Sequence, residues 1–260
     1  MRIGVWNLKL APVPGRARGE RMLELMREWD ADLWLLTEID AAWSLPGYTA
    51  VTSGPRSGAP PQKRWAGIMC RDDVLLTQLA RSDSTPADEG LCMARLVARD
   101  GNSPPLLVAC SVLPWATTAS AWPSLHATDG PDGYQNRFRY VTAVHLERIR
   151  RERQDEDVLV WGGDFNQSLT GRVLGTRSGR EVLSSAFEDL GVVPLTAEAP
   201  HLGAMACSID HVTVSLRWAA SSAVTVVTRT DDARQDSDHA LYLVDVVLTG
   251  SGSQEGAAGA

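Results

Sequence analysis

Residues 158–166, VLVWGGDFN, begin as a buried strand and end in polar residues. Four consecutive apolar residues are typical of a strand that is covered on both faces. The run then reaches two glycines and continues with Asp164 and Asn166, one on each side of Phe165. A carboxylate and a carboxamide here indicate either an Asx turn or a polar site at the edge of a sheet. We expect the glycines to let the chain turn sharply, so that Asp164 and Asn166 face one cleft and Phe165 points to the core.

In the sequence, one helix is predicted before this strand and another after it. A helical period is visible over residues 134–153 and again over residues 179–190, where Gly191 ends the helix. Three late strands are predicted at residues 208–216, 223–230 and 239–248. The arginine-rich run 147–153 is interpreted as a solvated helix face rather than a contact with nucleic acid.

The first half of the chain contains many short strands and one clear helix, over residues 17–29. Strands are expected at residues 1–8, 31–39, 48–52, 64–70, 74–79, 91–98 and 105–113. Loops are expected at residues 53–64 and 114–133, and loops around a rigid scaffold commonly set the choice of substrate. Because several strands follow one another without a helix, the sequence favours an α/β or α+β sandwich of two packed sheets over a doubly wound parallel sheet.

The composition is that of an ordinary globular protein, with 44% hydrophobic and 22% charged residues. We expect one domain over residues 1–248 and a disordered tail over residues 249–260, which are small and polar. The apolar runs are too short to cross a membrane, and the apolar pattern starts at Met1 without room for a signal peptide. A cytoplasmic protein with no membrane partner is therefore expected, and no protein partner is inferred.

The cysteines and the net charge argue against a zinc or disulfide protein and against a broad DNA-binding surface. The four cysteines are far apart, form no CxxC pair and lie in apolar runs; they are Cys70, Cys92, Cys110 and Cys207. We interpret them as reduced core residues rather than zinc ligands or disulfides. The formal net charge of -7 argues against a broad basic surface that holds duplex DNA. It is compatible with a local phosphate site whose positive charge comes from a metal ion.

Polar residues also end or begin other strands, and each has an ordinary structural explanation. Asn7 suits a turn, Glu38 a solvated strand end, and Asp210 a hydrogen bond to a backbone amide. Asp238 and His239 precede the last strand, where a histidine is commonly a structural hydrogen-bond partner. Together with the polar residues of GGDFN, however, they supply the hard oxygen donors and the imidazole that metal-assisted phosphoester hydrolysis needs.

This chemistry explains the residue types. Mg²⁺ prefers oxygen ligands and usually keeps several waters, so one or two carboxylates suffice to hold it. A phosphoester is anionic and repels a nucleophile, so the site has to neutralise its oxygens and place a water in line with the leaving group. An Asp can orient that water, an Asn can donate to a phosphoryl oxygen, and a His can bind or protonate the phosphate when a carboxylate holds its tautomer.

Five short motifs in order carry a family resemblance. They are WN (6–7), TE (37–38), GDFN (163–166), IDH (209–211) and SDH (237–239). The set resembles the endonuclease/exonuclease/phosphatase superfamily, which includes DNase I-like nucleases, abasic-site endonucleases, sphingomyelinases and inositol-phosphate phosphatases. The resemblance implies a four-layer α/β sandwich, with two mixed sheets face to face, helices outside, and a Mg²⁺-dependent site at one end of the sheets.

The resemblance also implies a role for each polar residue. Asn7, Glu38 and Asp238 would bind the metal, and Asp164 would activate the attacking water. Asn166 and His239 would contact the phosphate, and Asp210 would orient His239. Glu38 would be the principal metal ligand, and Mn²⁺ could replace Mg²⁺. Asp238 could belong to a second metal site, and His239 could act as a base instead of contacting the phosphate.

One position departs from the family pattern. The family usually has a His or Tyr near the end of the central strand, whereas Val112 stands there in LLVACSVLPW (106–115). Ser111 should point to the opposite face of the strand, and His126 in the following loop is more simply a surface residue than a substitute. The missing group could slow the reaction, change the leaving group that is served, or have no effect.

The leading interpretation is a metal-dependent phosphohydrolase that acts on nucleic acid or on a small phosphorylated molecule. The sequence does not separate a nuclease from a phosphatase, although low basicity slightly favours small or single-stranded substrates. Tryptophans that could stack on a base or sugar lie near loops at Trp43, Trp65, Trp115 and Trp122. The alternative is a non-catalytic binding or scaffold protein, which Val112 favours and the retained carboxylates disfavour.

Overall fold

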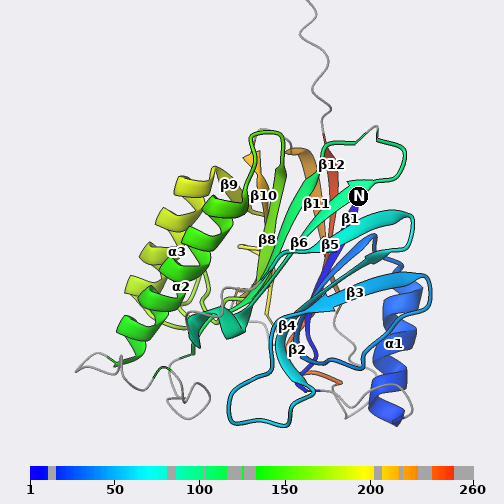
Figure 1. Ribbon diagram of the computed structural model, residues 1–260. Helices are drawn as coiled ribbons and strands as arrows, with labels where there is room; N and C mark the ends of the chain where they lie inside the picture. Colours follow the sequence, from blue (N-terminus) through cyan, green and yellow to red (C-terminus); the bar gives the residue numbers. More distant parts are fainter. Residues whose placement is uncertain are drawn as a thin grey trace, which may run out of the picture.

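The computed structural model describes residues 1–10, 16–80, 86–101, 103–115, 125, 133–201, 207–216, 219–227 and 236–248 of the chain. These residues form two six-stranded sheets that lie face to face, with helices on the outer faces (Figure 1). Each sheet contains both parallel and antiparallel pairs. The predicted four-layer α/β sandwich is therefore confirmed.

The first sheet is built around the amino-terminal strand. β1 (Arg2–Asn7) runs parallel to β2 (Leu33–Asp40) and antiparallel to β12 (Leu241–Leu248). The sheet is completed by β4 (Lys63–Arg71), β3 (Tyr48–Thr52) and β11 (Ala219–Val227), in the order β11-β12-β1-β2-β4-β3. α1 (Ala17–Trp29) covers its outer face, where Met22 and Met26 share an apolar cluster with Trp34 of β2.

The second sheet contains the stretch VLVWGGD. β8 (Val158–Asp164) runs parallel to β7 (Leu106–Val112) and antiparallel to β10 (Asp210–Ser215). The sheet is completed by β5 (Val74–Gln78), β6 (Leu91–Ala98) and β9 (Val192–Pro194), in the order β5-β6-β7-β8-β10-β9. Its outer face is covered by α2 (Gly133–Glu152) and α3 (Arg177–Leu190), and the short 3-10 helix η1 (Pro86–Gly90) leads into β6. Figure 1 shows α2 and α3 on one side of the sandwich and α1 on the other.

The two sheets meet in an apolar core. Ile3 and Leu35 from the first sheet lie in one cluster with Val160 and Val212 from the second. All four cysteines are free thiols, and three of them lie in this core: Cys70, Cys92 and Cys110. The interpretation as core residues holds for these three, whereas Cys207 is half-buried.

Most predicted elements begin and end within a few residues of the expected positions, and α1, β3 and β6 have the expected bounds. The sequence pattern does not predict β9 or η1, because elements this short show no periodicity. The end of the predicted loop 53–64 belongs to β4, which begins at Lys63. Most of the loop 114–133 and the tail 249–260 lie outside the described residues. None of the helices described is long and apolar enough to span a bilayer.

Strand direction brings the predicted polar residues to one end of the sandwich. β1 and β2 are parallel, so Asn7 lies beside Thr37, the neighbour of Glu38. β10 runs antiparallel to β8, so its first residue, Asp210, pairs directly with Asp164, the last residue of β8. Residues far apart in the chain therefore meet where the central parallel strands end.

The two glycines of β8 allow close approach of the neighbouring strands rather than a turn. Both glycines lie within β8, so the predicted sharp turn at this point is wrong. A Cβ on Gly162 would lie 2.4 Å from the carbonyl oxygen of His211, and a Cβ on Gly163 would lie 2.1 Å from that of Ser111. Gly163 also has a φ of +125°, which other residues rarely adopt. Phe165 is completely buried in the helix-side core, as predicted.

Gly163→Ala is expected to lower the free energy of unfolding by about 3 kcal/mol or more, because the new methyl group meets backbone atoms of β7 that cannot move aside. Gly191→Ala is the matched control, since Gly191 has a φ of +61° but nothing within 4 Å of an added Cβ. There only the backbone conformation is unfavourable, at a cost of about 1 kcal/mol. Urea denaturation measures both values, and equal losses would contradict the explanation by close packing.

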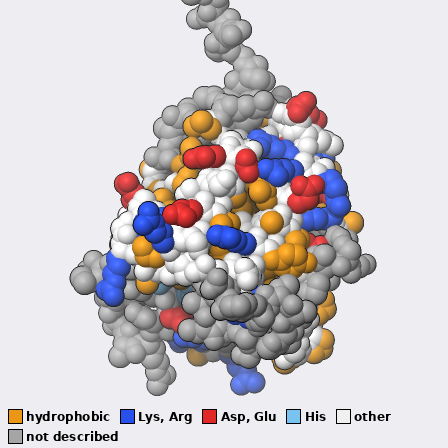
Figure 2. All heavy atoms as spheres, turned by 90° about the vertical axis from the view of Figure 1, so that its left-hand side faces the viewer, with side chains coloured by type: hydrophobic (Ala, Val, Ile, Leu, Met, Phe, Trp, Pro, Cys, Tyr) orange, Lys and Arg blue, Asp and Glu red, His pale blue; other side chains and the backbone are white. Residues whose placement is uncertain are grey.

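The outer face of α2 and α3 carries charges of both signs, which Figure 2 shows interspersed. Arg150 forms an ion pair of 2.9 Å with Asp189, and Arg151 forms one of 3.3 Å with Glu152. Arginines whose charge is paired in this way do not make a continuous basic surface. Arg150 and Arg151 are exposed, whereas Arg148 is buried and donates to the carbonyl of Ala80, so the interpretation of residues 147–153 as a solvated helix face holds only in part.

Candidate active site

Asp164 lies at the centre of the polar end of the sandwich. Its Oδ2 accepts a hydrogen bond of 2.9 Å from Nδ2 of Asn7, and its Oδ1 accepts one of 2.9 Å from the backbone N–H of Asn166. Asn166 has a φ of +51°, so the chain makes an Asx turn directly after β8. The Asx turn and the polar site are therefore one feature, because the turn holds the carboxylate in place.

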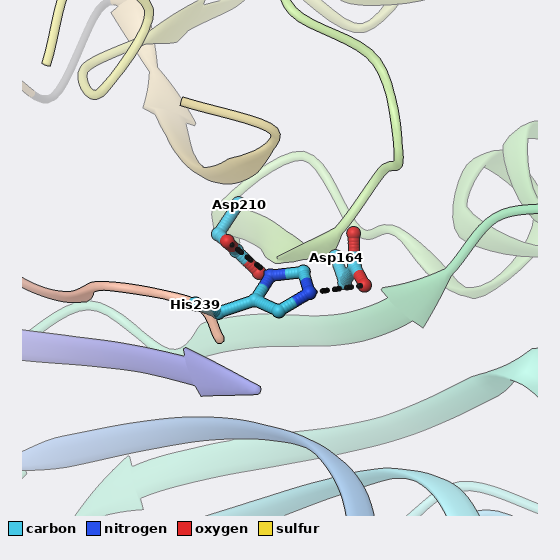
Figure 3. Close-up of side chains that lie close together, drawn as sticks. All are labelled: Asp164, Asp210 and His239. Atoms are coloured by element: carbon cyan, nitrogen blue, oxygen red, sulfur yellow. Dashed lines mark hydrogen bonds and ion pairs between the residues drawn. The ribbon is translucent and has the colours of Figure 1, made fainter. Parts of the chain in front are cut away.

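His239 is held between two carboxylates (Figure 3). Its Nδ1 lies 2.8 Å from Oδ2 of Asp210, and its Nε2 lies 4.0 Å from Oδ2 of Asp164. The backbone N–H of His239 donates to Oγ of Ser237, whose hydroxyl donates to the carbonyl of Asn7 at 2.6 Å. Because an ionised carboxylate only accepts, Asp210 makes Nδ1 the donor and leaves Nε2 directed at Asp164.

Burial and mutual attraction shift the protonation of these side chains. Burial raises the pKa of Asp164 to about 7, against the opposing attraction of His239. Burial acts to lower the pKa of His239, but the carboxylates of Asp210 and Asp164 outweigh it and raise that pKa to about 10. The carboxyl of Asp164 therefore holds a proton more readily than a free Asp, and the imidazole of His239 holds one more readily than a free His.

Asp210 is completely buried, and its backbone is clamped by Ser208. Oγ of Ser208 accepts from the backbone N–H of Asp210 at 3.0 Å and donates to its carbonyl at 2.6 Å. One ligand atom each from Asp164, Asp210 and His239 lies within 4.8 Å of the others, which is also a possible metal-binding arrangement. The same three side chains are joined by the hydrogen bond between Asp210 and His239 and by the ion pair between Asp164 and His239.

Glu38 departs from regular strand geometry. It has a φ of +50°, and the ladder between β2 and β4 passes from the pair Thr37–Ala66 to the pair Ile39–Arg64 without including it. Burial raises the pKa of Glu38, and the side chain of Asn7 acts on the same carboxylate through a hydrogen bond. A non-glycine residue in this conformation costs about 1–3 kcal/mol and is found most often at functional sites.

The donor set of Glu38, Asn7 and Asp238 fits Mg²⁺ or Mn²⁺. All three residues offer hard oxygen atoms, and the charge of Asp238 contributes to raising the pKa of Glu38. A cation between the two carboxylates would relieve that repulsion. Asp238 is exposed and forms an ion pair of 2.7 Å with Nζ of Lys9, so it lies at the rim of the site.

The end of β7 supplies no His or Tyr to the site. Val112 pairs in register with Asp164 and is fully buried. Ser111 points to the other face, as predicted, because its hydroxyl accepts a hydrogen bond of 2.9 Å from Nε1 of Trp161. His126 lies outside the described residues.

Two further side chains lie at the site without belonging to any motif. The ring of His201 packs edge-on against His239, with 5.5 Å between ring centroids. Nδ1 of His201 is buried and has no hydrogen-bond partner among the described residues. Arg56, from the loop before β4, lies over Trp65 with its Cζ 3.6 Å from the ring centroid. Neither residue ends a strand or repeats a pattern, so the sequence contains no local signal for them.

Comparisons with known proteins find relatives of the same architecture. The model of the Endonuclease/Exonuclease/phosphatase family matches residues 4–239. No curated protein matches the chain.

Solved structures with this fold include the catalytic domain of human Nocturnin with bound sulfate, at a TM-score of 0.66 and 15% identity over 96% of this chain and 94% of that one. A mannosyl-6-phosphatase from Bacteroides thetaiotaomicron has a TM-score of 0.63 and 16% identity over 95% of this chain and 99% of its own. An AP endonuclease from Archaeoglobus fulgidus has a TM-score of 0.63 and 13% identity, again over 95% and 99%. At these identities the likeness shows the fold.

Proposed function

Because the chain belongs to the endonuclease/exonuclease/phosphatase family, we propose that it is a phosphohydrolase that uses Mg²⁺ or Mn²⁺ to cleave a phosphodiester or phosphomonoester bond by in-line attack of water. Members of this family are hydrolytic phosphoesterases, both nucleases and phosphatases. The observation that carries the proposal is the placement of His239 Nε2 at 4.0 Å from Oδ2 of Asp164, at the same strand ends as Glu38. This combines a base, a cationic donor and a hard metal ligand in one site.

Asp164 is the base in this scheme. Burial raises its pKa, and a raised pKa makes the carboxylate a better acceptor for a proton from the attacking water. His239 keeps its proton, so Nε2 can donate to a phosphate oxygen while Asp210 holds the ring in place. Asn166 donates one amide hydrogen to the carbonyl of Leu113 at 2.9 Å, and its second amide hydrogen can reach the same phosphate.

Asn7, Glu38 and Asp238 would hold the metal ion. When bound, the ion neutralises phosphate oxygens and so lowers the repulsion that an attacking water meets. Asn7 also donates to Asp164, and this hydrogen bond connects the metal ligands to the base. A loss of Asn7 would therefore affect both parts of the site.

The proposal covers both classes of ester. Solved structures of the same fold include a mannosyl-6-phosphatase and an AP endonuclease, so the architecture accommodates both a small phosphorylated sugar and a nucleic acid. A purely structural role is less well supported, because a scaffold gains nothing from mutually repelling carboxylates at one end of its sheets.

The test is hydrolysis of a diester and a monoester, bis-p-nitrophenyl phosphate and p-nitrophenyl phosphate, with Mg²⁺, Mn²⁺ or EDTA. We expect turnover that requires the metal, and the ratio of the two rates separates a nuclease-like from a phosphatase-like enzyme. Wild-type protein that is inert with every metal, on these esters and on a panel of DNA and RNA, would contradict the proposal.

Glu38→Gln is expected to bind Mn²⁺ at least ~10-fold more weakly, because the principal charged ligand is lost. Calorimetric titration measures this without turnover. Glu28→Gln is the control, since Glu28 lies on the exposed surface of α1. Equal Mn²⁺ affinity in Glu38→Gln and the wild type would remove Glu38 from the proposed ligand set.

A further inference from the structure

The geometry points to Arg56 as a substrate-binding residue that contacts the scissile phosphate group, at the place where Val112 leaves the site without the family His or Tyr. This inference rests on the proposed function. It gives a role to the loop 53–64, which carries no motif.

Trp65 connects the metal ligand Glu38 with the end of β7. On β4 it stands opposite Glu38, at the position where the ladder to β2 is interrupted. Its ring contacts Trp115 edge-on, at 5.8 Å between centroids, and Trp115 follows β7. Trp65 and Val112 also belong to one apolar cluster. Trp65 therefore stands opposite Glu38 in one sheet and contacts Trp115, which follows β7 in the other.

Arg56 is the group that lies on Trp65. A distance of 3.6 Å from Cζ to the ring centroid is that of a stacked cation–π pair. Trp65 and Trp43 are both buried, so neither is the exposed platform for a base that their place near loops suggested. Stacking uses the face of the guanidinium, whereas its N–H groups lie at the edge of the plane, where hydrogen bonds to phosphate oxygens form.

The loop that carries Arg56 is anchored on both sides of it. The backbone N–H of Arg56 donates to the carbonyl of Lys63 at 3.0 Å. The backbone N–H of Ser57 donates to Oε2 of Glu89 at 2.9 Å, and the Ser57 hydroxyl donates to the other carboxylate oxygen. An anchored loop presents the guanidinium with little further loss of conformational entropy when a substrate binds.

The charges around Arg56 agree with this position. Burial lowers the pKa of Arg56, and the carboxylates of Glu38 and Glu89 act in the opposite direction. The guanidinium of Arg56 lies over Trp65, which stands opposite Glu38 in the ladder between β2 and β4.

A fixed guanidinium at this point suits a phosphate group. Arginine binds phosphate oxygens through two parallel N–H···O bonds and remains charged at all working pH values. It would stabilise the negative charge that builds up on these oxygens as water attacks. The side chain of Val112 has no hydrogen-bond donor, so the end of β7 offers none to the phosphate. Arg56, from the other sheet, would provide this donor.

Arg56→Met tests this role, with Arg64→Met as the matched control. Arg64 lies in the same hairpin and donates to the carbonyl of Lys63 at 3.0 Å, so its variant removes the same charge from the same region. We expect kcat/KM to fall about 10²-fold in Arg56→Met and less than about threefold in Arg64→Met. Added guanidinium ions should restore part of the activity of Arg56→Ala, an effect that a merely structural arginine would not show.

Binding of inorganic phosphate in the presence of Mn²⁺, measured by calorimetry, separates Arg56 from the proposed function as a whole. We expect Arg56→Met to bind phosphate at least ~10-fold more weakly than the wild type and Arg64→Met. Equal affinity in all three proteins, or no binding by the wild type, would overturn the role of Arg56. If the wild type has no turnover, the proposed function fails, and the phosphate titration still decides about Arg56.

Discussion

Asp164→Asn is expected to lower kcat roughly 10³- to 10⁴-fold while KM changes little, because the carboxamide keeps the shape of the side chain but cannot take a proton from the attacking water. Binding of Mn²⁺ should stay within about threefold of the wild-type value, since Asn7, Glu38 and Asp238 are unchanged. Steady-state kinetics on both esters and a calorimetric metal titration measure these quantities.

The melting temperature of Asp164→Asn shows whether a loss of activity comes from the missing base or from unfolding. Both carboxylate oxygens of Asp164 accept hydrogen bonds, from Asn7 and from the backbone of Asn166, whereas an Asn has one acceptor oxygen, so the melting temperature is expected to fall modestly while the protein stays folded. Asp189→Asn, on the exposed surface of α3, removes the same charge far from the polar strand ends and should keep full activity. If a folded Asp164→Asn protein retained more than about a tenth of wild-type kcat, Asp164 would not be the base.

His239→Gln is expected to lower kcat/KM about 10³-fold, because the cationic donor to the phosphate is lost. Asp210→Asn should cost less, roughly 10- to 100-fold, since the imidazole remains but loses the partner that holds it at 2.8 Å. Asp210 is a positioning residue in this scheme and acts through His239.

A double-mutant cycle on kcat/KM checks the coupling of these two residues. The double variant His239→Gln/Asp210→Asn should be no slower than His239→Gln alone, because Asp210 has nothing left to orient. Additive losses would instead show that Asp210 acts on the substrate or the metal directly. Unchanged Mn²⁺ affinity in both single variants is the accompanying control.

The sequence predicted the fold class and the set of residues that gather at one end of it. Asn7, Asp164, Asp210 and His239 are joined by hydrogen bonds and a close ion pair, and Glu38 lies beside Asn7. This was possible because each polar residue follows or precedes an apolar strand, which is a local pattern. The catalytic and metal-binding roles assigned to these residues remain predictions.

Other features could not be read from the chain. The function of Gly162 and Gly163 depends on how closely β10 and β7 approach, and only the strand order decides this. Arg56 and His201 lie in loops, where neither period nor motif shows which side chain they will meet. Trp65 is near a loop in sequence, yet it is buried, because Arg56 and Trp115 cover it.

The sequence by itself therefore determined where strands and helices form and which strand ends are polar, because apolar periodicity and turn residues act over a few neighbours. Only the tertiary structure decided that GGD continues the strand, that His239 lies between Asp210 and Asp164, and that Arg56 covers Trp65. Those contacts join segments that are distant in the chain, and their geometry follows from the order and register of strands in two packed sheets.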